Sequence, residues 1–323
     1  TEDSNAGMAG PAMIEGGGLG TYHPSEIGPA PVQRANGVID IVVRDEAQAV
    51  AVAKRYLAYF QGDLAEWDAA DQRILRHVVP ENRRRAYDVR RVLDVLFDAG
   101  SVLELRRDFG VGVLTALARV EGRPLGVVAN NPMHLGGAID ADASDKAARF
   151  MQLCDAFDLP LLYLCDTPGF MVGPDAEKSA LVRRASRMFV VAGSMTVPVG
   201  TVVLRKGYGL GAQAMALGSF RTPRFIVGWP TSEYGPMGLE GAVKLGFRKE
   251  IEAIKDPEER EQLYRQIVAM AYQRGKGLNV AAHFEIDDVI DPAETRAWIS
   301  TVLTSAPSPA RRGGKKRPMI DTW

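Results

Sequence analysis

Backbone N–H groups, rather than acidic or basic side chains, are the groups that the spacing of this sequence best prepares for chemistry. Residues 202–214 read Val-Val-Leu-Arg-Lys-Gly-Tyr-Gly-Leu-Gly-Ala-Gln-Ala. The apolar run is typical of a buried strand, the alternating glycines of a tight turn, and the small residues after them of a helix. Because the first N–H groups of a helix lack partners within it, they can face a developing negative charge. The stretch therefore predicts an anion-stabilising backbone turn.

Two more glycine-rich loops follow predicted strands. Residues 130–140 read Asn-Asn-Pro-Met-His-Leu-Gly-Gly-Ala-Ile-Asp, and residues 166–173 read Asp-Thr-Pro-Gly-Phe-Met-Val-Gly. Loops at the carboxyl ends of parallel strands emerge at one edge of a sheet, where ligands bind in open α/β folds. Three such loops on successive units predict one crevice lined by backbone N–H groups.

The side chains that usually perform catalysis are scattered. The four histidines follow no metal-ligand spacing, and the sequence has no Gly-x-Ser-x-Gly elbow, so neither a metal site nor serine hydrolysis is expected. His134, Asp166 and Glu233 lie in or near the predicted loops, either as acids or bases or as ordinary loop and turn residues. This scarcity is expected where a cofactor supplies the base and the protein supplies N–H donors.

Alternating strands and helices must position these loops. Apolar runs predict strands over residues 38–43, 102–105, 113–120, 125–129, 161–165, 199–204 and 224–229. Helical patterns cover residues 45–60, 87–97, 144–158, 176–192, 212–217, 240–283 and 292–303. Ser144 and Asp256 are predicted N-caps, and residues 122–124 a hairpin turn. The alternation predicts βαβ units, and hence an α/β fold with mainly parallel pairing.

Length and charge predict one large domain with extensions. The chain has 323 residues, 24% of them charged, and a net charge of −1, so its bulk charge suggests neither a nucleic-acid nor a membrane partner. Residues 1–37 are rich in glycine and proline and predict an arm, residues 38–305 the α/β domain, and residues 306–323 a basic tail. The interpretation favoured for the tail is a solvated segment or one that lies along an interface.

The two cysteines predict a reducing compartment. Cys154 and Cys165 lie in apolar surroundings, which is typical of buried free thiols. The polar N-terminus does not resemble a signal peptide, so we expect the cytoplasm, or an organelle matrix after processing. Because the chain begins at Thr1, either an initiator Met was removed or the sequence is a piece of a longer protein.

Several motifs occur in a fixed order between residues 131 and 292, within a resemblance that covers roughly residue 7 to the end of the chain. They read Asn-Pro-Met-His-Leu-Gly-Gly-Ala-Ile-Asp (131–140), Lys-Ala-Ala-Arg-Phe (146–150), Cys-Asp-Ala-Phe (154–157), Asp-Thr-Pro-Gly-Phe (166–170), Arg-Lys-Gly-Tyr-Gly (205–209), Trp-Pro-Thr (229–231) and Asp-Asp-Val-Ile-Asp-Pro (287–292). As an ordered set they resemble the carboxyltransferase (β) subunit of biotin-dependent acyl-CoA carboxylases of the propionyl-CoA and acetyl-CoA type. The match is to the C-terminal half, which implies one crotonase (ClpP)-like carboxyltransferase domain of superhelical ββα units. Residues 1–37 then resemble the end of a preceding N-terminal carboxyltransferase domain.

The resemblance implies roles for individual residues. The second oxyanion turn falls on Gly209, Leu210, Gly211 and Ala212, and many relatives have Gly-Gly-Ala where this chain has Leu-Gly-Ala. The position that tunes acyl length in relatives falls on Gln213. The biotin side falls on the second loop, and the first loop brings its backbone close to a ligand. The residues that the resemblance assigns to cofactor binding are Gly136, Gly137, Ala138, Gly169, Phe170 and Gln213.

The implied reaction moves CO₂ from carboxybiotin to the α-carbon of an acyl-CoA, with biotin taking the α-proton. The implied partners are a biotin carboxylase, a biotin carboxyl carrier subunit, and the N-terminal carboxyltransferase half, in the same chain or another. An oligomer, either homomeric or heteromeric, is expected, because in the family the site lies between domains of different protomers.

Two other functions remain open. The same backbone turn serves a biotin-independent crotonase-type decarboxylase or thioester hydrolase, whose activity avidin leaves unaffected. The missing half also allows a non-catalytic subunit that completes a partner's site, and such a chain alone binds neither CoA nor biotin.

Overall fold

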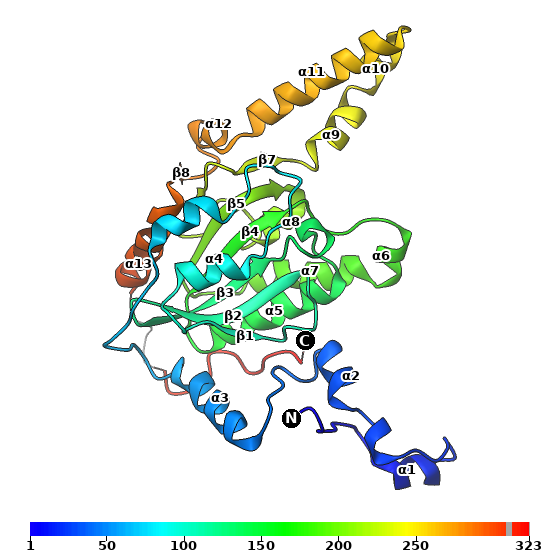
Figure 1. The fold of residues 1–323 in the computed structure, drawn as a ribbon, viewed down its shortest axis with the longest axis vertical. Helices are drawn as coiled ribbons and strands as arrows, with labels where there is room; N and C mark the ends of the chain where they lie inside the picture. Colours follow the sequence, from blue (N-terminus) through cyan, green and yellow to red (C-terminus); the bar gives the residue numbers. More distant parts are fainter. Residues whose placement is uncertain (308–311, 323) are drawn as a thin grey trace.

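One mixed sheet forms the centre of the computed structural model, which describes residues 1–307 and 312–322 (Figure 1). Its order is β1-β2-β3-β4-β5-β6-β8, and β7 pairs with β5 beyond the end of β6. β1 to β3 are antiparallel and the other pairings are parallel, which confirms the expectation of mainly parallel pairing. The strands are β1 (Leu103–Leu105), β2 (Val113–Val120), β3 (Arg123–Asn130), β4 (Leu161–Thr167), β5 (Val199–Tyr208), β6 (Phe225–Gly228), β7 (Glu233–Gly235) and β8 (Asp288–Val289).

Helices cover both faces of this sheet. The central strand β4 alternates, with Tyr163 in one core cluster and Leu164 in the other, so the sheet is buried on both sides. α5 and α7 pack on the first face, and α4 and α13 on the second. The α-helices are α1 (Pro11–Gly16), α2 (Ala30–Ala35), α3 (Glu46–Ala58), α4 (Arg90–Leu96), α5 (Ala141–Ala156), α6 (Pro174–Lys178), α7 (Leu181–Ala192), α8 (Gly209–Ala214), α9 (Leu239–Gly246), α10 (Arg248–Ala253), α11 (Pro257–Gly275), α12 (Gly277–Ala282) and α13 (Thr295–Ser305).

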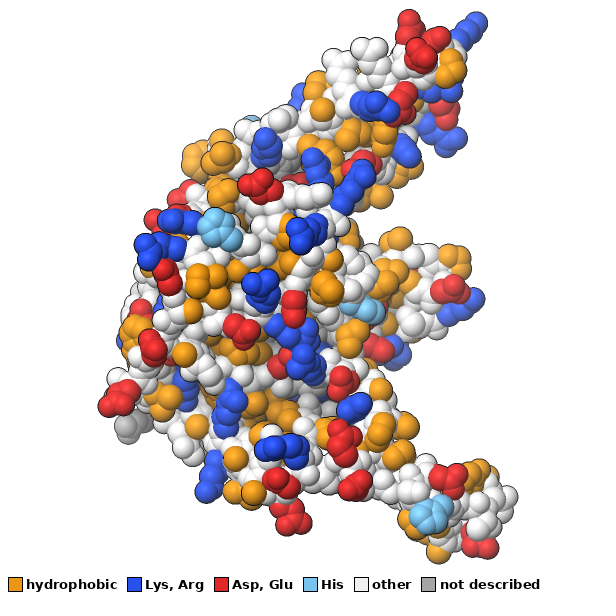
Figure 2. Space-filling view, viewed as in Figure 1, with side chains coloured by type: hydrophobic (Ala, Val, Ile, Leu, Met, Phe, Trp, Pro, Cys, Tyr) orange, Lys and Arg blue, Asp and Glu red, His pale blue; other side chains and the backbone are white. Residues whose placement is uncertain are grey.

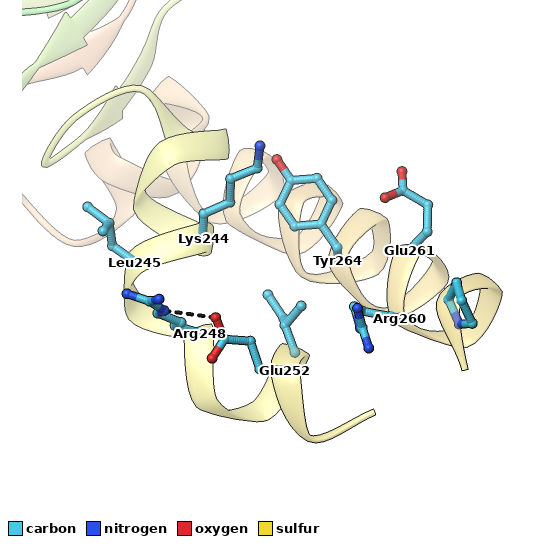
Figure 3. Close-up of a pocket in the computed structure, with 9 residues that line it drawn as sticks. Lys244, Leu245, Arg248, Glu252, Arg260, Glu261 and Tyr264 are labelled. Carbon is cyan, nitrogen blue, oxygen red and sulfur yellow. Dashed lines mark hydrogen bonds and ion pairs between the residues drawn. The ribbon is translucent and has the colours of Figure 1, made fainter. Parts of the chain in front are cut away.

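A helical arm made of α9 to α12 projects from this body, at the top of Figure 1. Asp256 caps α11, since its carboxylate accepts from the N–H groups of Glu258 and Glu259 at 2.8 and 2.9 Å, and this prediction is confirmed. A cavity of about 520 Å³ lies between α9–α10 and α11 (Figure 3). Its wall includes the Arg248–Glu252 ion pair at 2.9 Å. The helical region expected over residues 240–283, with helices over 249–255 and 256–275 separated at Asp256-Pro257, is four helices, and the break before Pro257 is confirmed.

Residues 38–43 form no strand, so that prediction is wrong. The segment lies beside β1, where the Arg106 N–H donates to the Asp40 carbonyl and the Arg106 Nε to the Asp40 carboxylate, each at 2.9 Å. Strand pairing requires a series of such backbone hydrogen bonds, and one is not enough. Ile41 packs against the core without the segment joining the sheet, whereas Val38 is exposed.

Helix beginnings also differ from the predictions. Asp140, not Ser144, caps α5, because its carboxylate accepts from the Ala143 N–H at 2.8 Å, while Ser144 lies buried inside the helix. Residues 176–192 form two helices rather than one, since Ala180 takes a left-handed conformation with φ 57°. Val120 pairs directly with Arg123, so the hairpin turn is residues 121–122 and not 122–124.

The turn predicted over residues 205–211 is shorter than expected. β5 continues to Tyr208 because β7 pairs with its last residues, Lys206 opposite Glu233 and Tyr208 opposite Gly235. α8 then begins at Gly209 instead of Ala212. Strand β5 is therefore followed by helix α8 with no loop residue between them.

The described part of the tail folds back onto α5 and is not simply solvated. Lys316 Nζ and Arg317 Nε lie 3.0 and 2.6 Å from the Asp155 carboxylate, and Arg312 pairs with Asp158. Residues 308–311 and 323, which belong to the predicted basic tail, lie outside the described residues. Both thiols are free and buried, as predicted, and burial raises the pKa of Cys154 and of Cys165.

Candidate functional site

The turn at the end of β5 is built around two glycines. Gly209 opens α8 with φ 56°, and a Cβ there would lie 2.6 Å from the Pro236 carbonyl oxygen. Gly211 and Ala212 are buried, whereas Leu210 is 64% exposed. Since a helix leaves its first N–H groups without intrahelical partners, the amides of residues 209–212 are the donors that this turn offers.

The second loop lies directly against this turn. A Cβ on Gly211 would be 2.7 Å from the carbonyl carbon of Gly169 and 3.1 Å from the amide nitrogen of Phe170. The Gly169 N–H donates to Thr167 Oγ1 at 3.1 Å, which holds the loop in place. The backbones of the two loops can approach this closely only because residue 211 is glycine.

The first loop packs on the second. A Cβ on Gly137 would overlap the Asp166 carbonyl oxygen. Two backbone bonds continue the contact, from the Ile139 N–H to the Gly169 carbonyl at 3.0 Å and from the Met171 N–H to the Ile139 carbonyl at 2.9 Å. The three glycine-rich loops therefore meet at one edge of the sheet, as their place in the sequence predicted.

The predicted residues differ in what they present at this edge. Ala138 is buried behind the first loop, and the Phe170 ring is directed toward Phe189, with 6.3 Å between ring centroids. Gln213 is exposed and lies three residues after Leu210, so both occupy one side of α8. Leu210 and Gln213 thus contribute side chains to the surface, whereas the glycines contribute backbone.

Asp166 is held by a network that favours a structural role. Its carboxylate is fully buried and accepts from Arg205 Nε and from the Lys206 N–H, each at 3.1 Å. Arg205 also lies over the Tyr87 ring, 5.0 Å from its centroid. Burial, and then the negative charge of Asp166, raise the pKa of Tyr87 well above its ordinary value. The two donors stabilise the charged carboxylate and occupy its oxygens, which disfavours the alternative that Asp166 acts as a base.

Lys206 and Tyr208 are two residues whose contacts sequence reasoning missed. Lys206 Nζ donates to the Gly136 carbonyl at 2.5 Å and lies 3.5 Å from the Asp166 carboxylate, so it brings a positive charge to the meeting of the loops. The Tyr208 hydroxyl donates to Glu233 at 2.7 Å. Both residues stand beside the glycines in the Arg-Lys-Gly-Tyr-Gly motif. The pairing of β5 with β7 brings Glu233 to Tyr208, and the packing of the first and second loops brings Gly136 and Asp166 to Lys206.

His134 contacts the cap of α5 and not the turn, since its Nε2 lies 3.4 Å from the Asp140 carboxylate. Next to it, a cavity of about 370 Å³ opens between the first and second loops. Its lining includes Leu135, Asp140, Met171, Val172 and Leu181.

Two further properties concern the residues that the structure describes. Within residues 1–307 and 312–322, His, Cys, Asp and Glu side chains form no group of three or more that could hold a metal ion. No described helix combines the length and the apolar composition needed to cross a membrane. Figure 2 shows acidic and basic side chains interleaved over the face in view.

Comparison with known proteins gives consistent matches. The methylmalonyl-CoA carboxyltransferase 12S subunit of Propionibacterium freudenreichii subsp. shermanii is 35% identical over 94% of this chain. The biotin-dependent acetyl-/propionyl-coenzyme A carboxylase beta6 subunit of Mycobacterium bovis is 37% identical over 90% of it. A solved single-chain, multi-domain long-chain acyl-CoA carboxylase is 61% identical over 93% of this chain, with a TM-score of 0.87, and the match covers 30% of that protein.

These matches confirm the crotonase-like carboxyltransferase fold and the resemblance to acyl-CoA carboxylase β subunits. The chain spans 59% of the length of the 12S subunit and 61% of that of the beta6 subunit. Residues 2–320 match the family described as "Carboxyl transferase domain". The chain belongs to the carboxyl transferase domain family.

Proposed function

We propose that this chain forms the C-terminal half of a biotin-dependent acyl-CoA carboxyltransferase, which moves a carboxyl group from carboxybiotin to the α-carbon of an acyl-CoA. The observation that supports the proposal is the meeting of three glycine-rich loops at one sheet edge, in a chain of the carboxyl transferase domain family. Transfer to an α-carbon develops negative charge on a carbonyl oxygen, and fixed N–H donors stabilise such a charge.

We propose that the turn supplies these donors. The residues concerned are Gly209, Leu210, Gly211 and Ala212, whose amides begin α8. Each donor of this kind contributes on the order of 10²–10³ in rate. Gln213 lies on the same side of the helix as Leu210, where it would contact the acyl group or the cofactor.

The second and first loops would hold the cofactor. The residues are Gly136, Gly137, Ala138, Gly169 and Phe170. They suit a polar ligand because glycines let backbone N–H and C=O groups, rather than side chains, form the surface where the loops meet. When bound, carboxybiotin would supply the carboxyl group, and the biotin that remains would take up the α-proton. Lys206 places a positive charge beside the same backbone.

A further half must complete the site. Leu135, Val172 and Leu210 are 50%, 82% and 64% exposed around the loops, and such an apolar rim fits coverage by another domain. We propose that this is an N-terminal carboxyltransferase half, and that residues 1–37 correspond to the end of that half. Residues 38–305 would then be the C-terminal domain, and residues 306–323 its tail. Biotin carboxylase and carboxyl carrier subunits would complete an oligomeric enzyme. Its buried free thiols fit the cytoplasm.

The test is reconstitution of the chain with its N-terminal half, carboxylase and carrier. Carboxyl transfer from the carrier's carboxybiotin to a series of acyl-CoA esters, from acetyl to long-chain, is measured as radiolabel in the acyl-CoA. The expected result is transfer that avidin abolishes. Acyl-CoA hydrolysis or decarboxylation that avidin leaves unaffected would overturn the proposal in favour of a biotin-independent reaction. Full transfer by a complex that carries Gly211→Pro would instead indicate a non-catalytic subunit.

A further inference from the structure

Tyr208 joins the turn to a neighbouring strand through its side chain. It is the last residue of β5, is 3% exposed, and immediately precedes Gly209. Its hydroxyl donates to Glu233 Oε1 at 2.7 Å. A hydrogen bond from a hydroxyl to a carboxylate is stronger than one between neutral groups. Burial, and then the Glu233 carboxylate, raise the pKa of Tyr208 far above its ordinary value, so the hydroxyl remains a donor at neutral pH.

Glu233 is itself fixed by the base of the helical arm. Its backbone forms a bridge with Lys276, at the junction of α11 and α12. At the same junction the Gly277 N–H donates to the Ser232 carbonyl at 3.0 Å, and Gly275 comes so close to the Tyr234 carbonyl that a Cβ would overlap it. β7 is therefore held between β5 and the arm.

Arg83, from the segment before α4, contacts the arm and adds a positive charge near Glu233. Arg83 places its guanidinium over the Tyr272 ring, 3.5 Å from the centroid. Burial acts against the Arg83 charge, but Tyr272 and the carboxylates of Glu233 and Glu240 raise its pKa. Tyr272 in turn donates to Glu240 at 2.8 Å.

The turn is packed closely against neighbouring backbone at both of its glycines, which limits how far it can absorb a shift of Tyr208. On one side, a Cβ added to Gly209 would lie 2.6 Å from the Pro236 carbonyl oxygen. On the other, a Cβ added to Gly211 would lie 2.7 Å from the Gly169 backbone. A displacement at the end of β5 is therefore passed to the amides of the turn. Interiors packed this closely transmit strain.

We propose that Tyr208 and Glu233 are positioning residues, which hold the amides of residues 209–212 in the geometry that stabilises the developing oxyanion. The inference rests on the proposed carboxyltransferase function. A misplacement of about 1 Å from outside the reacting groups costs on the order of 10²-fold in rate.

The test compares Tyr208→Phe with Tyr264→Phe in the reconstituted enzyme. Tyr264 is the matched control, because its hydroxyl contacts the Glu240 carbonyl at 3.5 Å within the arm. We expect Tyr208→Phe to lower kcat by about 10- to 100-fold, with KM for acyl-CoA within about twofold. Tyr264→Phe leaves both unchanged. Glu233→Gln, which keeps an acceptor, should retain more activity than Glu233→Ala.

A second readout does not depend on activity. Hydrogen–deuterium exchange of a peptide spanning residues 207–215 should become about tenfold faster in Tyr208→Phe and stay unchanged in Tyr264→Phe. Unchanged kcat and exchange would overturn the inference, and so would a collapse of Tm that accounts for the lost activity. If the wild-type complex transfers no carboxyl group, the proposed function fails, while the exchange result still decides whether Tyr208 positions the turn.

Discussion

Gly211 lies directly against the second loop, since an added Cβ would meet the Gly169 backbone at 2.7 Å. We expect Gly211→Ala to lower kcat of the assembled enzyme by on the order of 10²-fold, because the turn must move away from Gly169. Steady-state kinetics measures the loss. Gly246→Ala is the control, as this exposed glycine of α9 has open space around it. Equal losses in the two variants would contradict the prediction.

Lys146 is a buried lysine, and the free-energy cost of burying its charged form makes the stability of the fold depend on pH. It is 2% exposed, its Nζ donates to the Phe109 carbonyl at 2.9 Å, and burial lowers its pKa from 10.5 to about 7. Between these two values the unfolded chain binds a proton that the folded chain does not. The free energy of unfolding should therefore rise with pH over this window, by up to about 1.4 kcal/mol per pH unit from this group.

Lys146→Met tests that pH dependence. The substitution removes the charge, so this contribution to the slope of stability between pH 7 and 10.5 should disappear, and any gain over wild type should be largest near pH 7. Urea unfolding at several pH values measures it. Lys178→Met, at a side chain 77% exposed, should keep the wild-type slope. A slope that Lys146→Met leaves intact would mean that other groups produce it.

At the scale of elements, local patterns predicted what local physics decides. β2 has the predicted bounds, and Asp256 caps α11 as expected, because apolar runs and cap residues act within a few positions. Residues 38–43 have the same apolar pattern but no strand partner, whereas β5 extends to Tyr208 because β7 and the end of β4 pair with it. Pairing between segments distant in the sequence decided whether residues 38–43 form a strand and where β5 ends. Local sequence patterns do not predict such pairing.

The candidate site shows the same division. That three glycine-rich loops would meet followed from strand order, since parallel strands end at one edge. The fit of Gly211 to Gly169, and the contacts of Lys206 with Gly136 and Asp166, depend on the relative height of neighbouring loops. That height follows from the strand register and the close backbone packing of the folded sheet, which residue types alone do not specify.

Two helix N-caps, one in the body and one in the arm, can show whether these two parts unfold together. Asp140 caps α5, which is buried in the body, and Asp256 caps α11, which projects in the arm. Replacing either by Ala should cost about 1 kcal/mol of helix stability. We expect Asp140→Ala to lower the Tm of the chain. Asp256→Ala should instead speed hydrogen exchange over residues 257–275 and leave Tm nearly unchanged, because the arm opens locally. A common fall in Tm would show that arm and body unfold together.

At the scale of the whole molecule, the described tail closes the fold by neutralising a buried charge. Asp155 is 1% exposed and accepts from the Thr196 N–H at 2.7 Å, while Lys316 and Arg317 supply its positive partners. Burial disfavours the carboxylate, but the Thr196 N–H and these two cations hold the Asp155 pKa below its ordinary value. Its contribution to stability is therefore present at neutral pH and is lost as the pH falls through that lowered pKa.

Removing both cations should leave this carboxylate charged, buried and without its ion pairs. We expect Lys316→Ala with Arg317→Ala to lower the free energy of unfolding by about 3 kcal/mol at pH 7, in the range found when a buried pair loses its partner. The difference from wild type should narrow below about pH 4, where protonation relieves the unpaired charge. Denaturant unfolding across pH measures both effects. Lys315→Ala removes one positive charge from an exposed position of the same tail and should have little effect. A loss of the same size in that control would mean that the net charge of the tail, rather than its contact with Asp155, stabilises the molecule.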